Sequence, residues 1–520
     1  MTEFSDGGGD GGAVLSAAKA RWTLGITILA SSVAFIDMTI VNLALPIMQR
    51  DLGATFQDMQ WVVEAYILLL TALTLTGGGL ADAFGRRKLL CIGAFVFLVA
   101  SVMAGLATST PMLIAARVLQ GVGGAMLAPA SLAIVSSSFP PEQRGRALGQ
   151  WAAFSGVSTA IAPALGGILI ELWSWRAVFF VNVPLLLAVL WLAPRRLTET
   201  RRVRDVVRGA GKQVDWAGGL SAIAALAPLT YALLRAGQQG LGDPGVIAGL
   251  VMAVFMFAVF LRVEQRAAAP MVPLQLFRSR SFAGLNLMTL VIFTAVGGVM
   301  FMVPMVLIYS FGYSPAQTGA AVIPSMLAMF VLAPRVGRYA DRAGPRLPLT
   351  IGPLISAAAY LLFSQTTSPD YLSGVLAPIV LMGVGFGIWV TPLTSSVMSA
   401  AGERNAGIAS GINNAIARLA QLLAIACLGI IATVVFNGAI DIELSAMGLP
   451  AQALGLLEEQ RELLGAMSVP DGFPAEYALA LESSVRVAFR EAFAAVCLVC
   501  AALCCIAAAL GRWSVASLSR

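Results

Sequence analysis

The sequence GGLADAFGRRK at residues 78–88 returns in a related form as GRYADRAGPR at residues 337–346. Each copy follows a long apolar run and ends in basic residues. One short loop repeated in two distant parts of the chain predicts two homologous helical bundles. Bundles of this kind are arranged around a shared centre in many repeated membrane folds.

The composition excludes a soluble protein. Hydrophobic residues make up 58% of the 520 residues and charged residues only 12%, whereas soluble domains are about 25% charged. The apolar residues form long continuous runs, which indicate membrane-spanning helices, because barrel strands are short and alternate. We expect an all-α polytopic membrane protein with 14 transmembrane helices. The runs cover residues 22–47, 59–80, 88–107, 112–137, 149–170, 178–193, 216–235, 245–262, 282–309, 316–336, 348–364, 371–399, 407–436 and 486–510.

The loop charges predict the orientation, since Lys and Arg gather in cytoplasmic loops. Threading fourteen spans puts the basic groups on one side and the acidic segment 437–485, in which Arg461 is the one basic residue, on the other. Both termini are then cytoplasmic. The basic groups are Arg86, Arg87 and Lys88; Arg144 and Arg146; the segment 194–212; Arg262, Arg266, Arg278 and Arg280; and Arg335, Arg338, Arg342 and Arg346.

The repeat and the charges divide the chain into segments. We expect a flexible cytoplasmic leader, an N-terminal six-helix bundle, a basic cytoplasmic loop, two intercalated helices, a cytoplasmic linker, a C-terminal six-helix bundle with the outward acidic loop 437–485, and a cytoplasmic tail. Their ranges are 1–21, 22–193, 194–215, 216–262, 263–281, 282–510 and 511–520.

Several kinds of chemistry are disfavoured. The sequence has no histidine, which excludes His-based triads, metal sites and proton relays. Cys497, Cys500, Cys504 and Cys505 mimic a metal-ligand spacing, but their segment is apolar, so they are interpreted as buried small residues and no metal is expected. The slight excess of basic residues reports loop topology, so nucleic acid is not expected as a partner.

Further motifs point to a family. The stretches IDMTIVNLALP at 36–46, ARVLQGVGGA at 116–125, WSWR at 173–176 and FVNVP at 180–184 accompany the loop at 78–88. Together they resemble the major facilitator superfamily, and within it the fourteen-span drug:proton antiporters. The resemblance covers nearly the whole chain.

The resemblance implies a proton-coupled secondary active exporter, an antiporter of amphipathic or cationic drug-like compounds that works by alternating access. Such a protein is not an enzyme, needs no cofactor because the proton gradient drives it, and is a monomer in the lipid bilayer of the cell membrane. Asp37 and Arg117 match the family's proton-coupling positions. The conformational motif maps to Gly78, Asp82, Gly85, Arg86, Arg87, Asp341, Gly344 and Arg346.

The fifth-span antiporter signature is present only in part. Pro163, Gly166 and Gly167 match it, whereas Ser158 and Ala162 replace its first two glycines. Small residues still let helices pack closely, so we expect the helix interface to persist and antiport to be the direction of coupling.

Asp37, Glu64 and Arg117 are ionisable residues inside predicted spans, where charge is costly and functional by default. At 1.5 Å per residue, Asp37, Glu64 and Arg117 lie at a similar depth in the outer half. Asp37 is interpreted as the proton carrier and Arg117 as the group that tunes it; the alternative is a permanent structural ion pair. Glu64, which the family pattern does not supply, either joins proton coupling or is solvated at the membrane edge.

Candidates for the substrate cavity come from several spans. Asn414, Arg418 and Gln421 share one helical face, which either lines a cavity or makes interhelical hydrogen bonds. Met300 and Phe301 either supply an adaptable pocket or belong to the core. Asn42 and Gln120 are further cavity candidates. In the loop 437–485, AQALGLLEEQRELLGAM predicts a short amphipathic helix that caps the exit or merely links two spans.

Two rival functions stay open. One is an exporter or flippase of a specific lipid or endogenous metabolite, since fold does not fix substrate. The other is a membrane enzyme or sensor that does not transport. The sequence disfavours it because no loop carries a nucleophile–base pair or a phosphate-binding loop.

Overall fold

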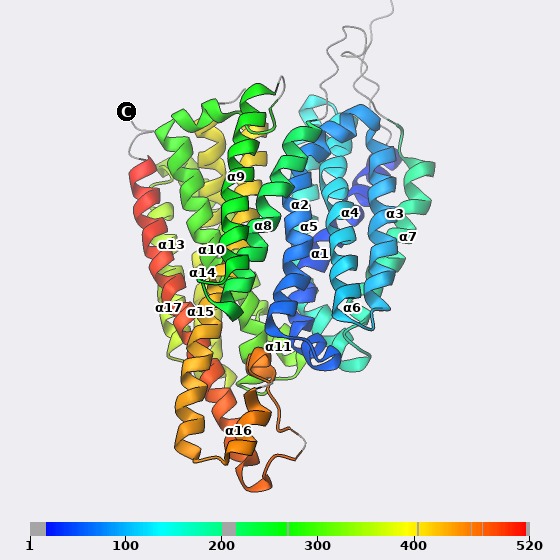
Figure 1. The fold of residues 1–520 in the computed structure, drawn as a ribbon. Coiled ribbons are helices and arrows are strands. Elements are labelled where there is room, and N and C mark those ends of the chain that lie inside the picture. Colours follow the sequence, from blue (N-terminus) through cyan, green and yellow to red (C-terminus); the bar gives the residue numbers. More distant parts are fainter. Residues whose placement is uncertain are drawn as a thin grey trace, which may run out of the picture.

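The computed structural model describes residues 17–199, 215–267, 270–402, 405–458, 460–470 and 472–515, and these residues form an all-α structure (Figure 1). The all-α prediction is therefore confirmed. Residues 1–16 of the expected leader, residues 200–214 of the expected basic loop, and residues 516–520 of the expected tail lie outside the described residues.

The helices follow the apolar runs but extend beyond them. The α-helices are α1 Ala17–Leu52, α2 Phe56–Phe84, α3 Arg86–Gly105, α4 Thr110–Ser138, α5 Pro141–Leu172, α6 Ala177–Phe180, α7 Asn182–Arg196, α8 Trp216–Gln239, α9 Pro244–Arg266, α10 Arg280–Tyr309, α11 Pro315–Ala321, α12 Ile323–Ala343, α13 Pro348–Ser364, α14 Leu376–Ala401, α15 Ala406–Met447, α16 Ala451–Glu458 and α17 Ala475–Val515. Shorter turns are η2 Leu274–Arg278, η3 Tyr371–Val375 and η5 Arg461–Ala466.

Within the described ranges, 12 helical segments are long and apolar enough to cross a membrane. The predicted runs at 59–80 and 348–364 are helical too, as α2 and α13, but are not among these twelve; α13 is apolar and shorter. Two runs that were expected as single helices are each divided. The run at 178–193 breaks at Val181 between α6 and α7, and the run at 316–336 breaks at Val322 between α11 and α12.

The segment 437–485 is not an irregular loop. Its ends continue α15 and α17, which project past the other helices and carry α16 between them (Figure 1). The expected single amphipathic helix is instead two short helices, α16 and η5. Leu457, Leu464 and Met467 are buried as its apolar pattern predicts, whereas Leu454 is exposed.

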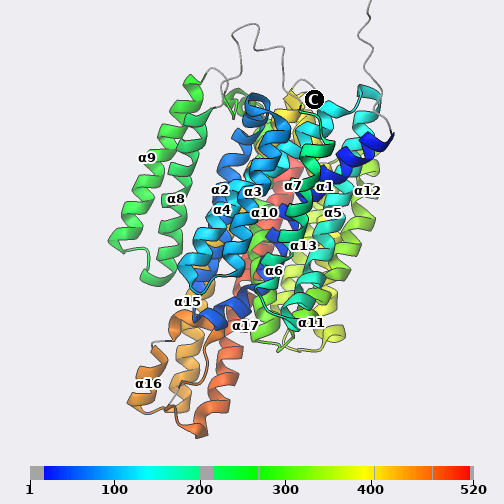
Figure 2. The same cartoon turned by 90° about the vertical axis from the view of Figure 1, so that its right-hand side faces the viewer.

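The helices pack as two groups with a hairpin between them. Helices α1–α7 pack on one another, as do α10–α17, and the α8–α9 hairpin packs through α8 on both α2 and α15 (Figures 1 and 2). Arg235 and Asp243 close the hairpin with an ion pair at 2.6 Å, and Asp243 also caps α9. The hydrogen bond from Arg235 holds the pKa of Asp243 below its usual range.

The repeated loops share their backbone geometry. Gly85 and Gly344 both have positive φ angles, 101° and 87°, and end α2 and α12. Their N–H groups donate to Ala81 O at 3.2 Å and to Ala340 O at 2.9 Å. A side chain would strain this left-handed region, so a glycine is required at each copy. We call the end of the molecule that holds these two loops the basic end, and the opposite end, which holds α16, the acidic end.

Candidate functional site

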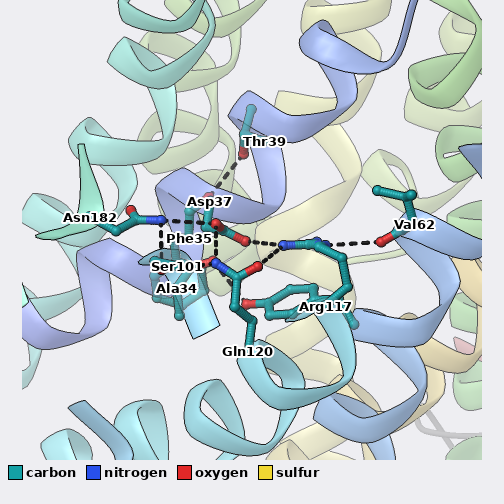
Figure 3. A network of polar contacts seen from close by, with 10 residues as sticks. Ala34, Phe35, Asp37, Thr39, Val62, Ser101, Arg117, Gln120 and Asn182 are labelled. Atoms are coloured by element: carbon teal, nitrogen blue, oxygen red, sulfur yellow. Dashed lines mark hydrogen bonds and ion pairs between the residues drawn. The ribbon is translucent and has the colours of Figure 1, made fainter. Parts of the chain in front are cut away.

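A buried polar network surrounds Asp37 in the interior of the first helix group (Figure 3). Arg117 Nη1 donates to Asp37 Oδ2 at 2.5 Å. Gln120 Nε2 and Asn182 Nδ2 each donate to Asp37 Oδ1 at 3.0 Å. Asp37 comes from α1, Arg117 and Gln120 from α4, and Asn182 from α7. Two helices, α4 and α7, thus place one cation and two amides around the carboxylate of α1.

Arg117 is held from three further directions. Its Nε donates to Val62 O of α2 at 2.9 Å, and its Nη1 also donates to Gln120 Oε1 at 2.7 Å. The guanidinium lies over the Tyr66 ring, 4.3 Å from its centroid, and such stacking stabilises a desolvated cation. Because its side chain is only 1% exposed, the cation depends on these partners in place of water.

The α4 motif explains how these groups can meet. A Cβ at Gly121 would collide with the Tyr66 carbonyl of α2, at 2.8 Å. Glycine at this position therefore lets α4 approach α2 closely, one helical turn from Arg117. The close approach brings the Arg117 side chain within reach of the α2 backbone.

Sequence reasoning missed two members of the network. Asn182 lies in the motif FVNVP but received no role, and Ser101 of α3 received none. Ser101 Oγ accepts from Gln120 Nε2 at 3.0 Å, and Asn182 lies 3.5 Å from the same oxygen. The polar residue in an otherwise apolar run was the available signal. Gln120, expected at the substrate cavity, lies in this network instead.

Glu64 is not solvated. Its side chain is 0% exposed, and neither carboxyl oxygen has a hydrogen-bond partner among the described residues. It also does not join the Asp37 network. Val62 and Tyr66, two residues to either side on α2, face Arg117, so Glu64 points to the opposite face of the helix. The alternative that Glu64 is solvated at the membrane edge does not hold, because its side chain has no exposed surface.

The three cavity candidates on α15, Asn414, Arg418 and Gln421, differ in their burial. Arg418 is half-buried and donates to Thr74 of α2 at 3.4 Å; Gln421 is half-buried, and Asn414 is exposed. The buried amide on α15 is the neighbouring Asn413, which donates to Asn286 and Thr289 of α10. Successive residues on a helix point about 100° apart. This difference in direction explains why Asn413 is buried whereas Asn414 is exposed.

The α10 and α1 candidates lie mainly in packed surroundings. Phe301 is buried edge-to-face against Phe56 of α2, with ring centroids 5.8 Å apart. This position favours the core interpretation over an open pocket. Met300 is half-buried. Asn42 has a buried amide oxygen without a hydrogen-bond partner among the described residues.

The conformational motif is only partly described, since the side chains of residues 75–79, including Gly78, and of Asp82 lie outside the described residues. Arg87 contacts the short segment that follows α7, through Leu197 and Glu199. Glu199 accepts the backbone N–H groups of Arg87 and Lys88 at 3.1 and 3.2 Å, which caps the start of α3. In the second copy Asp341 and Arg346 are exposed. Glu199 was counted only as a loop charge in the sequence.

The α5 signature lies where the two helix groups touch. A Cβ at Gly167 would collide with Pro315 O of α11, and a Cβ at Gly319 would collide with Pro163 O of α5. Gly166 faces Ile40 of α1. The two backbones therefore pack directly on each other, as the small residues of the signature predict.

Other contacts between the groups also lie at the acidic end. Glu171 at the end of α5 accepts from Ser314 Oγ at 2.7 Å and from the Ala316 N–H at 3.0 Å. Tyr309 Oη of α10 donates to Gln49 Oε1 of α1 at 2.9 Å. Gln49 Nε2 in turn donates to Leu463 O of η5 at 2.9 Å. The segment η5 thus touches both groups and helps to close this end.

Known proteins resemble the chain along most of its length. The sequence pattern of the Major Facilitator Superfamily matches residues 27–425. The chain is 34% identical to the multidrug resistance protein Stp of Mycobacterium tuberculosis over 78% of its own length and 75% of that protein. It is 33% identical to the tetracenomycin C resistance and export protein of Streptomyces glaucescens, covering 92% of this chain and 88% of that one.

A third relative and a solved structure also resemble the chain. The cephamycin export protein CmcT of Amycolatopsis lactamdurans is 37% identical over 73% of this chain and 78% of its own. A bacterial homologue of the human lysosomal transporter Spinster, in an inward-facing and unoccupied conformation, shares the fold with a TM-score of 0.65 at 17% identity, over 96% of this chain and 99% of that one. The chain therefore belongs to the Major Facilitator Superfamily, and its relatives are multidrug and antibiotic resistance efflux proteins.

Proposed function

We propose that the protein is a proton-coupled antiporter that exports amphipathic or cationic drug-like compounds by alternating access. The observation that carries the proposal is the buried Asp37–Arg117 ion pair with its two amide donors. An acid in the membrane interior marks an ion pathway by default. Resistance and export proteins among the relatives support the substrate class.

The coupling step follows from the chemistry of the pair. With Arg117 in place, Asp37 accepts three hydrogen bonds, from Arg117, Gln120 and Asn182. A proton that reaches Asp37 neutralises it, weakens its attraction to Arg117 and frees α1 to move relative to α4. Release of the proton restores the pair. Each inward proton contributes about 2.3 kcal/mol per 100 mV of membrane potential, which is equivalent to roughly a fifty-fold substrate gradient.

The membrane arrangement is part of the proposal. We infer fourteen spans, formed by the twelve long apolar segments together with α2 and α13, with the basic end in the cytoplasm and both termini there. The contacts at the acidic end support an inward-facing conformation. The protein acts as a monomer in the cell membrane, with lipid, substrate and protons as its only partners and the proton gradient in place of a cofactor.

Counter-transport in proteoliposomes tests the proposal. An imposed pH gradient should drive uphill movement of a cationic dye such as ethidium, with proton movement in the opposite direction. Asp37→Asn should abolish the uphill movement while purified protein still elutes as a single species and binds dye. The matched control is Asp370→Asn, which makes the same change at the turn before α14. Normal uphill transport by Asp37→Asn would sink the assignment of Asp37.

A specific metabolite is the second candidate substrate, because some relatives are named for the export of one antibiotic. The same assay separates the two cases. A drug exporter should drive several structurally unrelated compounds, whereas a dedicated exporter should drive one compound class and leave the dyes at background.

A further inference from the structure

Glu64 has a carboxyl group that the Asp37 network does not use. It is fully buried, and both of its oxygens lack a hydrogen-bond partner among the described residues. Burying an ionised carboxylate without a partner is costly, so such a group is stable there only with its proton bound. This environment therefore favours the neutral form of Glu64 in the closed conformation.

Glu64 lies at the contact between the two helix groups. It points away from Arg117, toward the side of α2 that packs on α15. One turn closer to the acidic end, Gln60 Nε2 donates to Ile425 O of α15 at 2.6 Å. Glycine at 429 makes room for that amide, because a Cβ there would collide with it. The α2–α15 contact thus covers Glu64.

A cavity of about 220 Å³ lies on the other side of Gln60. It opens at the acidic end and is lined by residues of α2, α8, α15 and the α16–η5 segment. Its wall is partly polar, with amide and charged side chains among its lining residues, and water can occupy such a space. Gln60, Gln238 and Asn437 are among its lining residues. Gln60 therefore separates this cavity from Glu64 by one helical turn.

The charged and titratable groups around Glu64 and the cavity come from α2, α8, α15 and the α16–η5 segment. On α15, Cys427 is half-buried, and Arg418 lies farther toward the basic end with Thr74. The α8 residues in the cavity wall are uncharged; Arg235 of that helix pairs with Asp243. The ionisable groups of the cavity wall are Glu458, Arg461 and Glu462, while Asp37 and Arg117 lie on the opposite face of α2. No cation in this set is hydrogen-bonded to Glu64.

We propose that Glu64 is a second proton-binding site, loaded from the acidic end through this cavity, and that its protonation is required for α2 and α15 to close. When the helices separate and Gln60 leaves Ile425, water reaches the carboxylate, and a hydronium ion gives it one proton and becomes water. The neutral acid can then be buried as the helices close. This inference rests on the proposed alternating access of the two groups, but not on the role of Asp37.

The proposal fixes the direction in which pH shifts the equilibrium between the open and closed states. The closed state binds one more proton at Glu64 than the open state, so raising the pH favours opening at the acidic end. Between the proton affinities of the two states, the open-to-closed ratio changes tenfold per pH unit, as linkage requires for one proton.

Distances between spin labels can measure this ratio. Leu172 at the end of α5 and Leu372 in η3 are highly exposed residues at the acidic ends of the two groups. Labels at Leu172→Cys and Leu372→Cys, in a variant with the six native cysteines replaced by alanine, should report a longer distance on opening. In nanodiscs between pH 5 and 9, the long-distance population should rise at least about tenfold with pH.

Three variants decide the matter. Glu64→Gln removes the titration and should leave the closed population high at every pH, while Glu64→Asp, which keeps a carboxyl group, should retain the response. Glu264→Gln is the matched control, because Glu264 is also buried but lies on α9 and accepts from the Val272 N–H, away from α15. A pH response in Glu64→Gln equal to that of the parent would overturn the proposal, as would a parent without any response. Neither result bears on Asp37→Asn, which is assayed by transport.

Discussion

At position 117 a single guanidinium meets a carboxylate, an amide oxygen, a main-chain carbonyl and an aromatic ring. Only arginine has enough donors and a flat face for such a set, so a lysine could not replace it. The pair with Asp37 is fully buried, and breaking a buried pair by removing one partner costs about 3–5 kcal/mol, because the other charge stays behind unpaired.

This environment predicts non-additive stability changes. Arg117→Ala should lower the thermal stability of the detergent-purified protein strongly, whereas the double variant Asp37→Asn/Arg117→Ala should recover part of the loss, with a coupling of about 1–3 kcal/mol. Heating followed by size-exclusion chromatography measures the order of stability. Asp51→Asn and Arg176→Ala provide the matched control, an exposed ion pair at 2.9 Å whose coupling should be about 0–1 kcal/mol. Simple addition of the losses at Asp37 and Arg117 would contradict the prediction.

Residue-level prediction succeeded where position along one helix was sufficient. Counting residues from the ends of the predicted spans placed Asp37, Glu64 and Arg117 at a similar depth in the membrane. The hydrogen bond from Arg117 to Val62 O is consistent with this depth. It could not tell which face of α2 Glu64 occupies, because that depends on which helix covers it. Asn182 was missed for a related reason: its direction is set by the break at Val181, which an uninterrupted apolar run does not reveal.

At the scale of elements, glycines fix how closely the two helix groups approach. The α5 and α11 backbones touch at Gly167 and Gly319, where even a methyl group has no space. Apolar runs predicted these helices, but they could not predict the division of one run into α11 and α12. They also could not show that the acidic segment continues α15 and α17 as helix, since its charges suggested a loop.

The α5–α11 contact gives a prediction with a control on the same helix. Gly167→Ala should force α5 and α11 apart and increase the long-distance population of labels at Leu172→Cys and Leu372→Cys. Gly149→Ala on α5 has no atom within 4 Å of the new Cβ and should leave the distances unchanged. Since alanine is also the better helix former, a shift with Gly149→Ala as large as that with Gly167→Ala would show that helix propensity, and not the close contact, is responsible.

For the whole molecule, three separate contacts hold the acidic end closed. Tyr309 with Gln49 joins α10 to α1, Glu171 with Ser314 joins α5 to α11, and Gln60 with Ile425 joins α2 to α15. Rocking of two rigid groups would break all three together, because packed groups exchange between discrete arrangements and do not deform continuously. Local loosening would break them one at a time.

The two possibilities predict different distances. Gln60→Leu removes one hydrogen bond, whereas Gln49→Leu and Glu171→Leu remove two each. A hydrogen bond is worth about 0.5–1.5 kcal/mol, so each bond lost should raise the open-to-closed ratio by roughly two- to twelve-fold. If the groups rock as rigid bodies, the Leu172→Cys and Leu372→Cys labels must show the same two distances in all three variants, with different populations. In the Gln60→Leu/Glu171→Leu double variant, the shifts in free energy should add, because distant contacts on one equilibrium act independently. A new distance in any variant would instead mean that its contact opens alone, and that the acidic end is closed by separate local contacts rather than by one movement of the two groups.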